Sequence, residues 1–312
     1  MKNASTILTR HPENPILTPA DVDNALAVFN PSPVMYQGKT LLILSVFKFE
    51  PNAPVGGYVA ESDDGVHFKV RSKPLIDLRN APHPFNLVKD PLIDSRITKI
   101  DDTYYFINPV DIEPGAPQGL LGGTKDFQTY QPLEIISLAP NRGTSLFPEK
   151  INGKYYRLDR PGAGKNPASI WLASSPDLIH WGGFRPVLKP GYMFWNQVKV
   201  GPTPPIKTPQ GWLVITHGVW SWGDADYHYY IAAILLDLNN PERVIGKTNS
   251  WLLAPEKDYE VHGTVNDVVF PCGALADFEK DELRLYYGAA DTNIGLATGP
   301  LSAVIEACQK EI

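Results

Sequence analysis

Four basic side chains stand near the ends of predicted strands and together have the chemistry of an anion-binding site. They are Arg142, Arg160, Lys199 and His217. An arginine guanidinium binds an oxyanion through two parallel hydrogen bonds, and a lysine adds a compact charge. If the four converge, they form a site for phosphate or a carboxylate. The alternative, which is the commoner one for any single Arg or Lys, is solvated surface charge.

Acidic side chains of two kinds could serve beside such a site. Asp94, in LIDSRI, precedes Arg96 by two residues, so strand alternation predicts both on one face. An arginine neighbour lowers an acid's pKa and burial raises it, and a purely structural acid–arginine pair is the alternative interpretation. Asp291, in the small-residue segment GAADTNIG, is either a ligand-binding acid or a turn cap.

Composition restricts the class of partner. The chain has 312 residues, a net charge of −6 and 20 % charged residues, so no basic excess exists to neutralise nucleic acid or an anionic membrane. No apolar run approaches the roughly 18 residues that span a bilayer. The first residues, MKNASTILTR, lack the apolar region of a secretion signal, which predicts a cytoplasmic protein.

Motifs for metals and nucleotide cofactors are missing from the sequence. Two cysteines, Cys272 and Cys308, give neither a disulfide framework nor a metal cluster, and the histidines show no HExxH or Cys/His spacing. There is no Walker motif, GxGxxG or GxSxG. We therefore expect no metal and no cofactor. Trp212 is expected in the core, whereas Trp220 and Trp222, in the polar segment WSWGDADYHYY, are candidates for stacking on a sugar.

The chain repeats one pattern five times. A tight polar turn leads into a β-branched and aromatic strand at 36–45, 99–108, 150–159, 208–218 and 279–289. A second turn follows each hairpin: AESDDGVHF, GTKDFQTY, ASSPDLIHW and ATGPLSAV in four units, with ILLDLNNPERVI in the remaining one. An apolar strand precedes each hairpin. Thirty prolines and 25 glycines also favour short strands over helices.

Five such units of roughly 50–70 residues predict an all-β fold, a five-bladed β-propeller in a single catalytic domain over 1–312. A β-sandwich with coincidental hairpins is the alternative. In a propeller the first strand of each blade lines the central channel. Polar residues at these strand ends should therefore share one mouth, and the candidates are Asn30, Asp94, Arg96, Glu149, Lys199 and Asp267, with Asp291 after the last hairpin strand.

With these residues in view, the chain resembles glycoside hydrolase family 130, the mannoside phosphorylase family, over roughly residues 12 to 300. The longest carriers are LFPEKINGKYYRLDRP (146–161), KVGPTPPIKTPQGWLVITHGV (199–219), YEVHGTVNDVVFPCG (259–273) and YYGAADTNIGLAT (286–298). The five-bladed propeller that this family adopts agrees with the repeat count.

The resemblance implies roles for the candidate residues. Asp94 matches the family's general acid in a D-x-R step, which is thought to act through a sugar hydroxyl. Arg142, Arg160, Lys199 and His217 match the phosphate-binding set that family hydrolases tend to lack. Asn30 and Asp291 match sugar-binding positions, and Arg96 and Glu260 are added here as expected substrate contacts. Two of the arginines in NRGTSLFPEKINGKYYRLDRP are thus expected to bind phosphate.

Two departures concern the sugar. Many members carry an arginine in the first hairpin strand, in a phrase like LLYR, where this chain has LLILS with Ser45. The following segment, VFKFEPNAPVGG, also differs from the common pattern, and the aspartate step reads IDSR rather than EDPR. The sugar or its linkage is therefore left open, together with the acceptor, the direction of the reaction and assembly into a homo-oligomer.

The expected reaction is inverting phosphorolysis of a β-mannoside or related disaccharide or oligosaccharide, with inorganic phosphate as co-substrate and an α-sugar 1-phosphate as product. Phosphate is an anionic nucleophile, so no second carboxylate is required. One alternative is a hydrolase of the same fold that uses a carboxylate base such as Glu149 or Glu260. The other is a non-catalytic sugar-binding propeller, which Asp94 lying far from the basic residues would favour.

Overall fold

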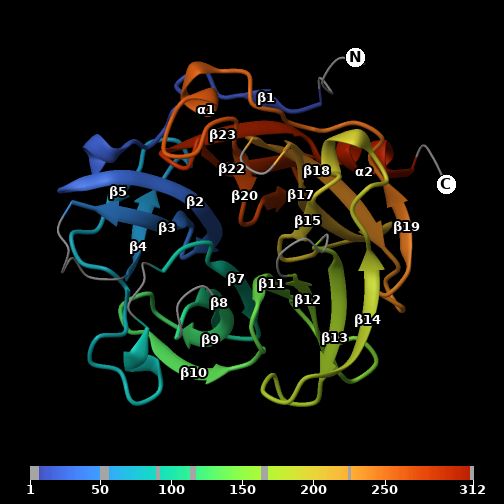
Figure 1. Cartoon of the computed structure of the whole chain (residues 1–312), viewed down its shortest axis with the longest axis horizontal. Coiled ribbons are helices and arrows are strands. Elements are labelled where there is room, and N and C mark those ends of the chain that lie inside the picture. The colour runs from blue at the N-terminus through green and yellow to red at the C-terminus, as the bar shows by residue number, and fades with distance from the viewer. Residues whose placement is uncertain are drawn as a thin grey trace.

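Five antiparallel sheets surround a central axis, as Figure 1 shows in a view down that axis. This computed structural model describes residues 7–49, 56–88, 92–112, 117–162, 168–223 and 226–309. The predicted five-bladed β-propeller is confirmed. Each sheet is one blade, and the blades follow one another in chain order.

The strands of the first three blades are as follows. Blade one contains β2 (Ala25–Tyr36), β3 (Lys39–Lys48), β4 (Gly56–Ser62), β5 (Lys69–Val70) and β6 (Ile76–Asp77). Blade two contains β7 (Arg96–Ile100), β8 (Thr103–Val110), β9 (Gln118–Thr124) and β10 (Gln131–Ile135). Blade three contains β11 (Asn141–Leu146), β12 (Tyr155–Pro161), β13 (Ile170–Ser175) and β14 (Gly182–Leu188).

The last two blades divide their first strand into two short pieces. Blade four contains β15 (Lys199–Pro202), β16 (Ile206–Thr208), β17 (Gly211–Trp222), β18 (Asp226–Leu236) and β19 (Val244–Lys247). Blade five contains β20 (Val269–Pro271), β21 (Leu275–Asp277), β22 (Glu282–Ala289), β23 (Asn293–Pro300) and β1 (Thr9–Arg10). The helices are α1 (Asp258–Val261), α2 (Leu301–Gln309) and the 3-10 turns η1 (Pro19–Asp21), η2 (Phe85–Leu87) and η3 (Phe194–Asn196).

The polar turns that the sequence repeats are the inner hairpin turns. Asn152 and Gly153 both take positive φ, 50° and 81°, as do Gln37 and Gly38 at 49° and 81°. Two successive positive φ values give a turn whose twist matches that of the flanking strands, which is why Asn and Gly recur there. The repeated turn residues in the sequence therefore reflect the backbone conformation that each of these hairpin turns requires.

The second repeated turn closes the outer hairpin in four blades through one shared device. Its aspartate is Asp64, Asp126, Asp177 or Asp237, and in each case the carboxylate accepts hydrogen bonds from the backbone N–H groups two and three residues later. Such Asx turns stabilise a reversal whether the next residue is glycine, as Gly65 is, or not, as with Phe127 and Leu178, which also take positive φ. The echo at ILLDLNNPERVI in blade four is therefore a genuine member of the set.

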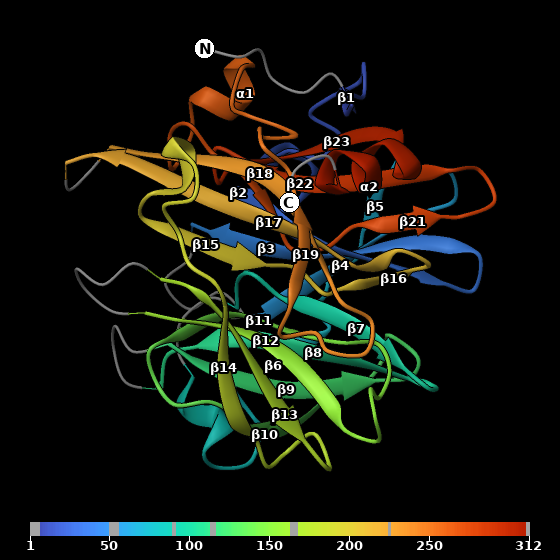
Figure 2. The same cartoon turned by 90° about the vertical axis from the view of Figure 1, so that its right-hand side faces the viewer.

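In the fifth blade, our expectation of the same turn at ATGPLSAV was wrong. This segment ends β23 and begins α2. The reason is ring closure: the outermost strand there is β1, whose Thr9 and Arg10 pair with Thr298 and Ala297, so no outer hairpin is needed. Figures 1 and 2 place α2 against the outer part of blades four and five, where it contacts β18, β19 and β23.

The hydrophobic core lies between the blades rather than in one centre. Five clusters of buried side chains fill the five junctions between neighbouring blades, with 18 residues between blades four and five and 14 between blades one and two. The cluster between blades two and three has 6 residues in the described part of the chain: Ile100, Ile107, Leu121, Ile136, Leu146 and Leu178. This junction therefore has the smallest apolar filling of the five.

The innermost strands β2, β7, β11, β15 and β20 each stand at one end of their sheet. Around the axis β2 contacts β7, β7 contacts β11, β11 contacts β15 and β20 contacts β2, whereas β20 meets blade four through β17 and β18. Among the described helices, none has both the length and the apolar character needed to cross a membrane. In the same residues no group of three or more His, Cys, Asp or Glu side chains is placed to hold a metal ion.

Candidate active site

Backbone irregularities at the start of the inner strands position the candidate residues. Asn30 has φ of 46° within a bulge of β2, and Asp94 has φ of 54° just before β7. Gly143, at φ of 72°, follows Arg142 in the bulge of β11. Non-glycine residues with positive φ cost free energy and tend to be retained where a side chain must be aimed. At the first two positions the unusual backbone brings Asn30 and Asp94 within hydrogen-bonding distance of each other.

Asp94 is held from two sides by blade one. The Asn30 Nδ2 donates to Asp94 Oδ1 at 2.7 Å, and the Asp94 backbone N–H donates to Ser45 Oγ at 3.0 Å. Ser45 is buried, so it supports the aspartate backbone. No described side chain donates to the second carboxylate oxygen of Asp94. That oxygen keeps its hydrogen-bonding capacity for a partner outside the described side chains.

Arg96 does not pair with the Asp94 carboxylate, and the strand-alternation argument was wrong there. Asp94 precedes β7 in a left-handed conformation, which breaks the alternation. Arg96 NH1 instead donates to the Asp94 carbonyl at 2.6 Å and to Cys272 Sγ at 2.9 Å, and the guanidinium lies over the Phe270 ring. Only 2 % of Arg96 is exposed. The arginine thus joins blades two and five beneath the mouth, and its expected sugar contact stays a prediction.

Arg142 and Arg160 stand directly opposite each other on the paired strands β11 and β12. Like charges in directly opposed positions destabilise a sheet. Neither side chain forms an ion pair or a side-chain hydrogen bond among the described residues, and the Nε atom of each is buried without a partner. Two adjacent cations with no carboxylate paired to either in the described chain repel each other, and an anion between them would stabilise both.

Lys199 and His217 complete what we call the basic cluster, with Arg142 and Arg160. Lys199 Nζ donates to the Tyr229 hydroxyl at 2.7 Å. His217 is 1 % exposed, packs against Phe270 with ring centroids 4.5 Å apart, and has no hydrogen-bond partner in the described chain for either ring nitrogen. The four basic side chains lie close together: Arg142 is opposite Arg160, and Arg160 and His217 both adjoin Gly201. Lys199 binds Tyr229, whose ring lies near that of His217.

Burial and repulsion between neighbouring cations make the charged forms of Arg160, Lys199 and His217 less stable and lower their pKa values. Burial, followed by Arg142, lowers the pKa of Arg160 to about 10. Burial, followed by Arg160 and Arg142, lowers the pKa of Lys199 to about 8. Burial and the nearby Arg160 and Lys199 lower the pKa of His217 well below its usual value, so its imidazole is neutral near pH 7. A bound anion would attract each of these cations and so offset the repulsion between them.

The acids lie next to the cations. Asp94 is close enough to act on the charges of both Arg160 and Lys199. Burial and the neighbouring Asp94 raise the pKa of Asp291 to about 7, so the two carboxylates and Asn30 form one group. The arrangement that would favour a non-catalytic propeller, an Asp94 remote from the basic cluster, is therefore not found.

Tyr229 is the residue that sequence reasoning missed. It binds Lys199, lies near His217 with ring centroids 6.3 Å apart, and lies close enough to Asp291 for that carboxylate to raise its pKa. Burial is the larger cause and, with Asp291, raises the Tyr229 pKa to about 12. The only available signal was its place in the aromatic run YHYY, where nothing distinguished it from its neighbours.

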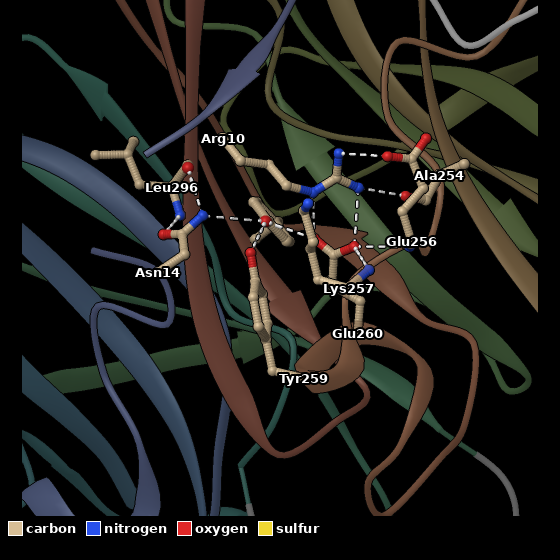
Figure 3. Close-up of polar contacts among 9 residues, drawn as sticks. Arg10, Asn14, Ala254, Glu256, Lys257, Tyr259, Glu260 and Leu296 are labelled. Carbon is tan, nitrogen blue, oxygen red and sulfur yellow. Dashed lines mark hydrogen bonds and ion pairs between the residues drawn. The ribbon is translucent and has the colours of Figure 1, made fainter. Parts of the chain in front are cut away.

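Glu260 belongs to a different cluster, shown in Figure 3. The carboxylate is fully buried and pairs with Arg10 Nε at 2.7 Å, accepts the Tyr287 hydroxyl at 2.7 Å, and accepts the backbone N–H groups of Glu256 and Lys257. Burial opposes its charge, but the Arg10 and backbone bonds are stronger together and lower the Glu260 pKa. The structure places Glu260 at the ring closure and not with the basic cluster.

Other predicted residues lie outside the group as well. Glu149 is exposed and pairs with Lys207 at 2.6 Å. Arg157 is buried in an ion pair with Asp159 at 3.0 Å. Trp220 and Trp222 contact each other on the projecting β17–β18 hairpin, and Trp222 is 73 % exposed. Asp267 adjoins the same hairpin, 3.7 Å from His228 Nδ1.

Comparisons with known proteins point to one family. The glycoside hydrolase family 130 model, described as beta-1,4-mannooligosaccharide phosphorylase, matches residues 4–310. The chain is 35 % identical to a 1,2-beta-oligomannan phosphorylase of Thermoanaerobacter, over 93 % of this chain and 96 % of that one. It is 32 % identical to a beta-1,2-mannobiose phosphorylase of Listeria innocua, over 97 % and 98 %. A solved structure of a Listeria innocua enzyme of that name, in complex with beta-1,2-mannobiose, superposes with a TM-score of 0.85 at 30 % identity, covering 97 % and 99 % of the two chains.

Proposed function

This chain belongs to glycoside hydrolase family 130, and on that premise we propose that it is an inverting β-mannoside phosphorylase whose whole length serves as one catalytic domain. Inorganic phosphate is its co-substrate, and an α-mannose 1-phosphate is its product. No other cofactor is required by this chemistry.

One observation carries the proposal: Arg142 and Arg160 face each other without a carboxylate partner in the described chain, beside Lys199. A phosphate dianion there would receive charge-assisted hydrogen bonds worth roughly 1.5–3 kcal/mol each. In an enzyme that activates neutral water, the same opposed arginines would repel each other with no anion to compensate their charges. The two glutamates named as bases for the hydrolase alternative, Glu149 and Glu260, are both engaged in ion pairs elsewhere.

The mechanism assigns Asp94 as the general acid. Its proton passes to the glycosidic oxygen, directly or through a sugar hydroxyl, while the bond from that oxygen to C1 breaks. A phosphate oxygen held by the basic cluster forms the new bond to C1 from the opposite face, which inverts the anomeric centre. Asp94 then regains a proton from solvent. Fixing the phosphate in line with C1 removes the entropy cost of bringing two solutes together.

The sugar contacts follow from the same group. Asn30 orients Asp94 through the 2.7 Å bond, and Asp291, with its pKa near 7, can donate to or accept from a mannose hydroxyl. We propose a β-1,2-linked mannoside as substrate. The support is that relatives named for 1,2-linked substrates match at 32 to 35 % identity, whereas a beta-1,4-mannooligosaccharide phosphorylase of Ruminococcus albus matches at 30 %.

The test runs the reaction in the synthetic direction. The protein is incubated with α-mannose 1-phosphate and a panel of acceptors that includes mannose, glucose and β-1,2- and β-1,4-mannobiose, and phosphate release is followed. We expect release with mannose or β-1,2-mannobiose, and a 1,2-linked product by NMR. Asp94→Asn and Arg160→Ala should each abolish it.

The controls separate the alternatives. Glu149→Gln, at an exposed ion pair, should leave the rate unchanged. Cleavage of β-mannosides at the same rate with and without phosphate would establish a hydrolase instead. A 1,4-linked product would leave the phosphorylase assignment intact and correct the linkage.

A further inference from the structure

A cavity of about 680 Å³ lies between blades two and three, where the interblade core is smallest. We call it the blade-two/three pocket. Its walls are the segment 135–141, which joins β10 to β11, and side chains of β12, β13 and β14. In Figure 1 these elements lie side by side in the lower half of the molecule. The volume is in the range of pockets that hold small ligands.

Aromatic rings form one wall of this pocket, and two of them, Trp171 and Phe184, contact neither another ring nor a cation in the described chain. Six of the seven tryptophans contact another aromatic ring or a cation in the described chain, and Trp171 is the exception. Phe184, on the rim, is 51 % exposed. Trp181 closes the wall and is covered on one side by the Arg157 guanidinium at 4.5 Å. Trp171 and Phe184 therefore offer flat apolar faces.

The floor of the pocket is polar but has no net charge. Asp159 Oδ1 accepts from Asn141 and Thr144, and its Oδ2 accepts from Arg157 Nε at 3.0 Å. A carboxylate has about four acceptor positions, so Oδ2 retains one, and the Asn141 amide retains one donor. The paired charges exclude an anion or a cation as the preferred ligand. A neutral hydroxyl, which both donates and accepts, matches what remains.

We propose that the blade-two/three pocket is a second carbohydrate-binding site, which takes a neutral pyranose with its apolar face on Trp171 and Phe184 and its hydroxyls toward Asn141 and Asp159. Sugars combine an apolar face with a rim of hydroxyls, and this pocket combines aromatic rings with a neutral polar floor. The choice of mannoside as the ligand rests on the proposed function, whereas the site itself does not.

The pocket stands directly behind the basic cluster. Asn141 and Arg142 are successive on β11, and Asp159 and Arg160 are successive on β12, so one pair faces the pocket while the other faces the channel. Asn141 Oδ1 also accepts the Arg160 backbone N–H at 3.2 Å. A sugar that engages Asn141 and Asp159 would therefore rigidify the hairpin that holds both arginines.

The test is calorimetric titration of β-1,2-mannobiose into the wild-type protein in phosphate-free buffer, where phosphorolysis cannot proceed. We expect two binding sites. Trp171→Ala should remove one of them, and Phe184→Ala, at an exposed ring, should weaken it by about 2- to 12-fold. Phe278→Ala, at a ring 56 % exposed on the far blade five, is the matched control and should change neither site. Asn30→Ala should weaken only the channel site.

Three outcomes would overturn the proposal. They are a single site in the wild type that a folded Trp171→Ala variant retains, two sites that persist in that variant with normal Phe184→Ala binding, and self-association that Phe184→Ala abolishes. The last would make a second copy of the chain the occupant. Because binding is measured without turnover, a chain that fails the phosphorylase assay can still show the second site, and an active phosphorylase can lack it.

Discussion

Gly201, on β15, leaves the space in which two members of the basic cluster meet, and we expect Gly201→Ala to displace them. A Cβ at this position would lie 2.3 Å from His217 Cε1 and 2.8 Å from Arg160 Cδ. Both distances are below any real carbon contact. The His217 ring cannot retreat easily, because it is 1 % exposed and packs on Phe270. The methyl group must therefore move Arg160 or the strand itself.

The size of the effect follows from the contacts involved. Overpacking by one methyl costs about 1–3 kcal/mol of folding free energy. Displacing Arg160 from a bound phosphate forfeits a charge-assisted hydrogen bond of about 1.5–3 kcal/mol. The second term corresponds to an increase of about 10- to 150-fold in the KM for phosphate. The KM for the mannoside should change little, because the three atoms nearest the added Cβ all belong to His217 and Arg160, and none to Asn30, Asp94 or Asp291.

The assay is phosphorolysis at varied phosphate and fixed mannoside, with thermal unfolding as a check on folding. Gly182→Ala is the matched control, because a Cβ there meets nothing within 4 Å and should leave both constants unchanged. A folded Gly201→Ala protein with wild-type phosphate dependence would refute the assignment of Arg160 and His217 to the phosphate site. A rise confined to the mannoside KM would do the same.

The remaining predictions concern three residues. The pKa of Lys199 is lowered to about 8, so its charge is lost as the pH rises through that value, and the KM for phosphate should rise over the same range. Measuring this KM at a series of pH values checks the prediction, and Lys199→Arg should flatten the pH dependence. Tyr229→Phe removes the 2.7 Å bond to Lys199 and should raise the KM for phosphate about 2- to 12-fold, with mannoside binding unaffected. Glu260→Gln should cost about 3 kcal/mol in denaturant unfolding, with normal turnover in the folded protein, because it removes the buried charge partner of Arg10 and leaves only the half-exposed Glu256 at 3.1 Å among the described acids. The folded state lowers the Glu260 pKa, so this contribution is present above the usual value of 4.5 and is lost in acid, where wild type and variant should converge.

Much of the fold was readable in the chain. The turns at Asn152 and at Asp177 are local: positive φ and an Asx hydrogen bond are properties of a few adjacent residues, so they repeat wherever a blade needs the same reversal. The spacing of these turns set the blade count. The fifth unit escaped the pattern because its outer strand, β1, comes from the opposite end of the sequence, and no local signal marks that pairing.

The candidate site was readable only in part. The residue types of the basic cluster and of Asp94 were identified with the help of the family resemblance, and the structure brings these five together. Arg96 was misplaced because a left-handed Asp94 interrupts the strand, and Glu260 was placed with the substrate although Arg10 binds it at the ring closure. Tyr229 was not singled out at all.

The sequence by itself determined the repeated hairpins, and hence a propeller, because turn and strand chemistry is decided among neighbours along the chain. The tertiary structure alone decided which charges lack a partner. Arg142 and Arg160 are opposed cations only because β11 and β12 pair in one register, and Glu260 is neutralised only because residues 250 positions apart meet. Whether an ionisable side chain serves chemistry or structure depends on what surrounds it, and packing between blades sets those surroundings.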